Sequence, residues 1–161
     1  MLRSGGLGRA AALCAVLLAP ALGCTDVTNM PEPAPSTGLD EAVFRCNVEP
    51  VLARQCSYTA CHGVAGAALR VYTPGKLRAT EPQDLDHATA ELTAAEHHAN
   101  YLSATGFRFA AADPFDNLLV RKTLPASEGG YAHEGGAIFP NTTDPQWLAI
   151  YAWLAGMGRC P

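Results

Sequence analysis

One short segment of the chain brings together side chains that can do chemistry. Four residues separate Cys56 from Cys61, and His62 follows the second cysteine directly. Two thiols and an imidazole so close together can bind a metal ion, and two thiols can close a disulfide. Thiols also attach prosthetic groups through thioether bonds. The segment therefore has three interpretations.

We favour covalent attachment of c-type haem. Each thiol adds to a haem vinyl group as a thioether, and the histidine that follows the second cysteine becomes the proximal ligand of the iron. The histidine must be adjacent because the second thioether holds the porphyrin edge within one residue's reach of the iron. The usual motif has two residues between its cysteines. The loop between Cys56 and Cys61 must therefore bulge to present both sulfurs.

Two alternatives stay open for the same segment. In one, Cys56 and Cys61 form a disulfide that closes a small loop, and His62 is incidental. In the other, these three residues and one further ligand hold a metal ion such as zinc, which often uses cysteines two to four residues apart. An oxidising compartment works against free thiolates and so against the zinc site.

The flanking residues resemble those of bacterial cytochrome c-like lipoproteins. In that family a Val-x-Pro-x-Leu helix leads into the attachment motif, and here the stretch is Val48-Glu49-Pro50-Val51-Leu52. The family often has a late His-x-Gly-Gly segment and a final helix that begins Asp-Pro. This chain has His133-Glu134-Gly135-Gly136 and Asp144-Pro145. The resemblance touches both ends of residues 44–157 and leaves the middle unmatched.

The resemblance implies an all-α, cytochrome c-like domain with packed N- and C-terminal helices and long loops. It implies one covalent haem c, bound by Cys56, Cys61 and His62. In such folds the first and last helices cross, so a disulfide between Cys46 and Cys160 would staple their contact. Sequence distance favours this pairing, because Cys56 and Cys61 are expected to act together. The sequence leaves other pairings open.

The sixth iron ligand is the least determined part of this hypothesis. Methionine is disfavoured, because Met30 precedes the domain and Met157 is expected in the last turn of the final helix. We favour His133, which lies in a Gly-rich loop before the final helix, where a distal ligand is expected; glycines let backbone approach a flat porphyrin closely. Adjacent His97 and His98 point about 100° apart on a helix, so only one of them could bind the iron. The simpler interpretation is that both lie on a solvated helix surface. His87 has no supporting pattern, and an open or water-bound site is a further alternative.

Residues 1–23 are expected to be a secretory signal peptide. Arg3 and Arg9 precede an apolar run over residues 10–22. Ala21-Leu22-Gly23-Cys24 resembles a bacterial lipobox with Ala in place of its first Leu, which implies cleavage before Cys24 and lipidation of that cysteine. An ordinary signal peptide with a coincidental cysteine is the alternative. An Asp directly after the lipidated cysteine would resemble an inner-membrane retention signal, but this chain has Thr25 there. We therefore expect a lipid anchor in the outer rather than the inner membrane.

The mature chain is then divided into a lipidated, Pro-rich tether over residues 24–39 and a domain over 40–161. Removing two arginines with the signal changes the formal net charge from −4 to −6. No basic face is implied, so nucleic acid is not an expected partner. Of six cysteines, Cys14 leaves with the signal and Cys24 carries lipid, which leaves four for the domain.

Hydrophobic spacing and capping residues predict mainly helices. A first helix is expected over residues 40–56 with a kink or restart at Pro50, and further helices over 93–103, 114–122 and 146–157. Residues 57–91 and 124–142 are expected to be mostly loop. The final helix is nearly apolar all round and should be buried on most sides. We interpret the aromatic residues of this helix, Trp147, Tyr151 and Trp153, as packing core rather than as cavity lining. Arg121 and Lys122 are interpreted as solvated surface rather than as partners of haem propionates.

The predicted function is electron transfer between redox partner proteins of the bacterial cell envelope. Scattered acids form no convincing acid–base pair, and there is no Gly-rich phosphate loop or Gly-x-Ser-x-Gly pattern, so we expect no enzyme. Two alternatives are retained. One is a cofactor-free, disulfide-stapled envelope lipoprotein with a binding or structural role. The other is a haem enzyme or sensor with an open iron site.

Overall fold

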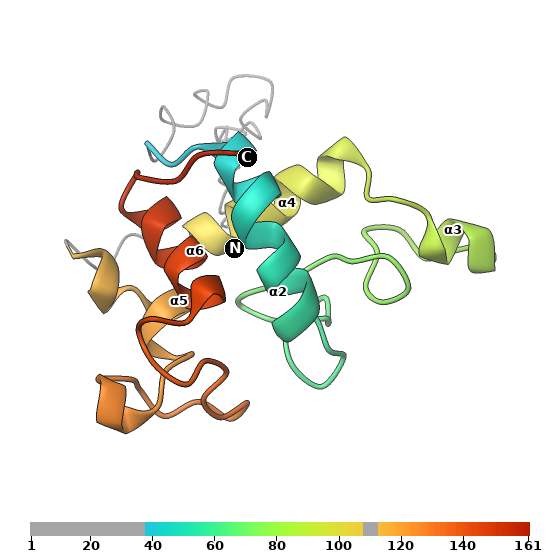
Figure 1. The fold of residues 1–161 in the computed structure, drawn as a ribbon. Helices are drawn as coiled ribbons and strands as arrows, with labels where there is room; N and C mark the ends of the chain where they lie inside the picture. Colours follow the sequence, from blue (N-terminus) through green and yellow to red (C-terminus); the bar gives the residue numbers. More distant parts are fainter. Residues whose placement is uncertain (1–37, 108–112) are drawn as a thin grey trace, which may run out of the picture. The chain divides into compact units, whose positions relative to one another are not determined.

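The computed structural model describes residues 38–107 and 113–161, and those residues form helices, turns and loops without a strand (Figure 1). This confirms the predicted all-α class. No helix in the described part of the chain is both long and apolar enough to cross a membrane. The predictions for residues 1–23, for Cys24 and for Met30 lie outside the described residues.

The first helical stretch consists of three consecutive pieces: α1 (Glu41–Val43), the π-helical turn η2 (Phe44–Val48) and α2 (Glu49–Gln55). Asp40 caps its start, accepting a hydrogen bond of 2.7 Å from the Ala42 N–H. Pro50 lies in the first turn of α2, where its missing N–H costs little. The predicted restart at Pro50 is confirmed, whereas the π-helical turn before it was not expected.

The middle of the chain holds α3 (Leu85–Thr89) and α4 (Ala94–Thr105). At the start of α4, the Thr93 hydroxyl accepts from the Glu96 N–H and the Glu96 carboxylate accepts from the Thr93 N–H, which confirms the predicted capping box. The helix ends before Gly106, as expected, and runs two residues beyond the predicted end at Ser103. The short helix α3 was not predicted within its loop region.

A long, mostly irregular region separates α4 from the last helix. It contains the 3₁₀ turn η4 (Pro114–Asp116), the short helix α5 (Leu118–Arg121) and the 3₁₀ turn η5 (Ala126–Glu128). The helix expected over 114–122 is therefore present as two short pieces. The described residues that follow up to 143 form turns and loops, as expected.

The last helix, α6 (Pro145–Leu154), begins at the predicted Asp-Pro pair, and the Asp144 carboxylate accepts from the Gln146 N–H at 2.8 Å. The prediction that it reaches Met157 was wrong. The Met157 N–H bonds to the Ala152 carbonyl and the Gly156 N–H to the Trp153 carbonyl, a pattern that ends a helix before a left-handed glycine. Met157 is 64% exposed beyond the helix.

The first and last helices pack on each other, as expected (Figure 1). The ring centroids of Phe44 and Trp153 lie 5.1 Å apart, and both side chains are buried. The Trp153 indole N–H also donates to the Asp40 carbonyl at 2.9 Å. The predicted Cys46–Cys160 disulfide is present, so a covalent bond closes the same contact.

A buried ion pair fastens the loop before α4 to that helix. The Arg78 guanidinium forms two hydrogen bonds of 2.9 Å to the two carboxylate oxygens of Glu96. It also donates to backbone carbonyls around α3, including that of His87 at 2.8 Å. Charge-assisted, two-point pairing of this kind fixes geometry as well as adding energy.

Candidate functional site

The segment from Cys56 to His62 forms a tight loop directly after α2. Cys56 is the residue that ends the helix. The chain then turns at Tyr58, whose carbonyl accepts from the Cys61 N–H at 2.8 Å. The His62 N–H returns to the Cys56 carbonyl at 3.1 Å. The four-residue spacing is therefore a compact bulge that brings His62 back beside the end of α2.

Gly63 allows this loop to close. A Cβ atom at this position would lie 2.2 Å from the Ser57 carbonyl oxygen, which is far inside van der Waals contact. Ser57 is fully buried, and its hydroxyl accepts a hydrogen bond of 2.8 Å from Lys76. The first part of the loop is thus fixed in place, and only a residue without a side chain can pass beside it.

Both cysteines of the loop are free thiols in the structure, which does not form the alternative Cys56–Cys61 disulfide. Cys56 is buried and Cys61 is exposed. Burial, and to a smaller extent the nearby Cys61, raises the pKa of the Cys56 thiol to about 11. Cys56 is therefore protonated near neutral pH.

His62 is half-buried and oriented by one backbone group. Its Nδ1 lies 2.9 Å from the Leu69 carbonyl oxygen, so the ring donates there and presents Nε2 as the acceptor. Burial lowers the pKa of His62; the Leu69 hydrogen bond opposes this, while His133 and Lys122 add to it. A neutral imidazole with a fixed tautomer suits a metal ligand. No residue pattern indicated the role of Leu69, since every residue carries a backbone carbonyl.

The structure brings His133 and His62 together. Their ring centroids lie 5.9 Å apart, with the ring planes within 8° of parallel. Two metal–nitrogen bonds of about 2 Å each, with the half-widths of two imidazoles, would place the centroids about 6 Å apart. His133 Nδ1 lies 3.3 Å from the Gly136 carbonyl, and neither Nε2 has a hydrogen bond among the described residues. The centroid separation is therefore close to that of two imidazoles on one metal ion, and the two rings are stacked with nearly parallel planes.

A largely apolar cavity of about 390 Å³ adjoins these residues. This volume lies in the range of small-molecule and cofactor sites, which spans roughly 300–1,000 Å³. Both loop cysteines and both histidines line it, and Lys122 stands at its edge. Its apolar walls come from α2, the loop after it, the segment after α4, α5 and the loop before α6; they include Leu52, Leu69, Phe107, Leu118, Leu119 and Ile138.

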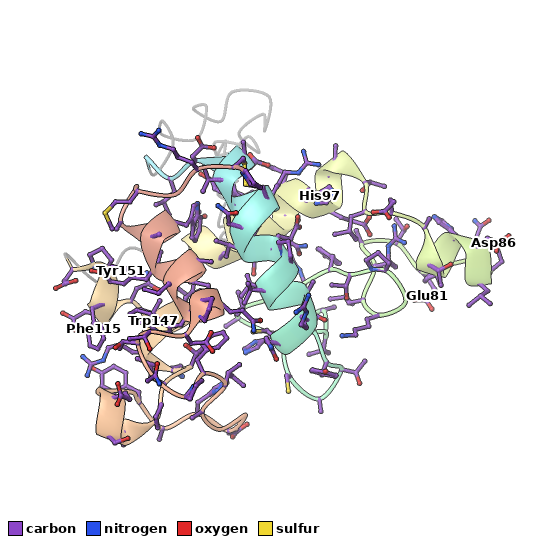
Figure 2. All side chains as sticks on the ribbon, in the orientation of Figure 1. Glu81, Asp86, His97, Phe115, Trp147 and Tyr151 are labelled. Carbon is purple, nitrogen blue, oxygen red and sulfur yellow. A yellow bond between two sulfur atoms is a disulfide. The ribbon has the colours of Figure 1, made fainter. Side chains whose placement is uncertain are left out.

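The other histidines are engaged elsewhere. Figure 2 labels His97 on α4; its Nδ1 lies 2.6 Å from a carboxylate oxygen of buried Glu49, and that of His98 lies 3.1 Å from Glu41. His87 is exposed on α3. None of the three lines the cavity.

The aromatic residues of α6 serve as packing core, as interpreted from the sequence. Trp147 and Tyr151 stack with ring centroids 5.1 Å apart, and Figure 2 shows them near Phe115. Neither they nor Trp153 line the cavity.

The protein groups at the site cannot complete a metal site by themselves. Within residues 38–107 and 113–161, no group of three or more His, Cys, Asp and Glu side chains could hold a metal ion. The four-ligand zinc alternative is therefore not formed by the described residues. Comparison with protein-family models, with curated proteins and with solved structures finds no match to the chain.

Proposed function

We propose that the chain is a lipid-anchored, monohaem c-type cytochrome-like electron carrier of the bacterial cell envelope. Cys56 and Cys61 would hold the haem, His62 would be the proximal ligand of the iron, and His133 the distal ligand. The observation that carries the proposal is the parallel pair of imidazoles, 5.9 Å apart at the edge of an apolar cavity.

The number of protein ligands supports haem over a bare metal ion. The histidine pair offers two nitrogen donors, and no third ligating side chain joins them among the described residues. A metal ion at this site would need its remaining ligands from elsewhere. A porphyrin supplies four nitrogen donors and leaves two opposite positions for imidazoles.

The cavity and its thiols support covalent attachment. Both sulfurs belong to residues that line the cavity next to His62, which a thioether-linked macrocycle requires. Thioether formation adds an S–H across a vinyl double bond, so no leaving group and no external oxidant are needed.

When bound, the haem would supply reversible one-electron chemistry. The chain would supply the binding site, the ligand orientation and the exclusion of water. The Leu69 carbonyl holds the His62 ring in one tautomer, and apolar side chains line the cavity beside it. Ligation by two histidines gives a lower potential than ligation by histidine and methionine, because methionine raises it.

The experiment is expression of the full chain in a bacterial host with haem c maturation. Denatured protein is separated on a gel and stained for haem peroxidase activity. We expect a stained band at the size of the mature protein, because thioether-bound haem survives denaturation. The matched control is the Cys56→Ala/Cys61→Ala variant, which should give an equal protein band without stain.

Two other outcomes would contradict the proposal. An unstained wild-type band with a Cys56–Cys61 disulfide would favour a cofactor-free, disulfide-stapled lipoprotein. A stained band whose reduced haem binds carbon monoxide rapidly and completely would favour an enzyme or sensor with an open iron site.

A further inference from the structure

The loop that carries His133 is fastened at both ends to the end of α5. At its start, the Tyr131 N–H donates to the Arg121 carbonyl at 2.9 Å. At its end, the Ile138 N–H donates to the Thr123 carbonyl at 2.9 Å. Residues 132–137 therefore form a loop whose two ends meet at nearly the same point of the chain.

The side chain of Arg121 strengthens the first of these attachments. Its Nε donates to the Gly129 carbonyl at 2.9 Å, and its guanidinium carbon lies 3.9 Å from the centre of the Tyr131 ring. An ion pair with Asp116, at 2.8 Å, holds the other side of the guanidinium. The Arg121 side chain is only 20% exposed, so water competes weakly for these contacts.

Inside the loop, His133 has few contacts of its own. Its Nδ1 lies 3.3 Å from the Gly136 carbonyl, and the Gly136 N–H closes a turn on the His133 carbonyl at 2.8 Å. Its neighbours Ala132 and Glu134 are exposed. The ends of the loop therefore help to set the place of the imidazole relative to His62.

We infer that Arg121 is a positioning residue for His133: it fixes the start of the loop so that the imidazole stays opposite His62. The inference rests on the proposed haem function. Without the Arg121 contacts, the backbone bond from Tyr131 would remain, but the loop would move more freely and His133 would leave the iron more often.

The test is the Arg121→Gln variant of the full chain, produced as holoprotein. We measure the equilibrium affinity of the reduced protein for carbon monoxide, which competes with His133 for the iron. We expect the affinity to rise about tenfold, the order expected from loss of a charge-assisted hydrogen bond. The ferric absorption spectrum should shift toward high spin, and added imidazole should restore the low-spin spectrum.

Two further variants make the result specific. Arg45→Gln changes an exposed arginine with no recorded side-chain contact among the described residues, and it should leave the affinity unchanged. Tyr131→Leu removes the ring beneath the guanidinium but keeps the backbone bond, and it should raise the affinity by a smaller factor. This variant also tests the inference if Arg121→Gln does not fold.

The outcomes separate this inference from the proposed function. A wild-type protein without covalent haem would overturn both. A haem-containing Arg121→Gln variant with unchanged carbon monoxide affinity would overturn only the positioning role, even if its melting temperature fell. An equal rise in affinity in the Arg45→Gln variant would also overturn it.

Discussion

Replacing Cys46 and Cys160 together by alanine removes the covalent link between the first helix and the C-terminal tail. The two residues are 114 positions apart, so the disulfide closes a loop that spans nearly the whole domain. The chain-entropy model gives about 4–5 kcal/mol for a loop of this length. We expect the free energy of unfolding to fall by up to that amount, and the melting temperature to fall by on the order of 15 °C.

The double variant should still fold, because the Phe44–Trp153 contact and the Trp153 hydrogen bond remain. The assay is urea unfolding followed by circular dichroism, on wild type and variant side by side. Arg159→Ala is the matched control, since it changes an exposed side chain next to the disulfide and should alter stability by less than about 0.5 kcal/mol. A loss below about 1 kcal/mol in the double variant would show that the disulfide does not stabilise the fold by closing this loop.

Three further predictions concern the loop, the ion pair and the two imidazoles. Gly63→Ala should destabilise the protein by about 1–3 kcal/mol in urea unfolding, whereas Gly66→Ala, with nothing within 4 Å of the new Cβ, should be nearly neutral. The Arg78 guanidinium holds the pKa of Glu96 far below its ordinary value of 4.5, so the pair stabilises the fold above that pH and this contribution is lost as the pH falls below it. Unfolding measured from pH 2 to 7 should therefore show a steeper acid loss in wild type than in Glu96→Gln, and parallel curves would contradict this. The parallel imidazole planes predict a rhombic, low-spin electron paramagnetic resonance spectrum of the ferric holoprotein, which His133→Ala should abolish; a highly anisotropic spectrum would indicate crossed planes instead.

The helix starts could be predicted because their signals are local. Asp144 caps α6 and Thr93 caps α4 through bonds to residues two or three positions ahead. The end of α6 was misjudged because the apolar pattern continues to Met157, although Gly156 marks the stop. The residue pattern of α6 therefore predicted that the helix exists but not where it ends.

Contacts between residues far apart in the sequence were harder to predict. The Arg78–Glu96 pair joins residues 18 positions apart, and nothing in the sequence distinguishes this arginine from others. Likewise, Pro50 predicted a restart of the first helix but not the π-helical turn before it, against which α6 packs. The buried partner of His97, Glu49, was also not foreseen.

The site was partly predictable. The spacing of Cys56, Cys61 and His62 drew attention to one loop, and the Gly-rich context favoured His133 among four histidines. The structure places all four residues at one cavity. The apolar walls could not be predicted, because they come from elements that meet only in the folded chain.

Peptide mass spectrometry of the mature protein shows directly whether haem is bound to Cys56 and Cys61. Trypsin should release residues 55–70 as one peptide, since Arg54 and Arg70 bound it and no basic cleavage site lies between them. We expect this peptide to carry the mass of one haem, with both Cys56 and Cys61 resistant to alkylation after reduction. The same peptide without haem, and with a Cys56–Cys61 disulfide that becomes alkylable on reduction, would contradict the account.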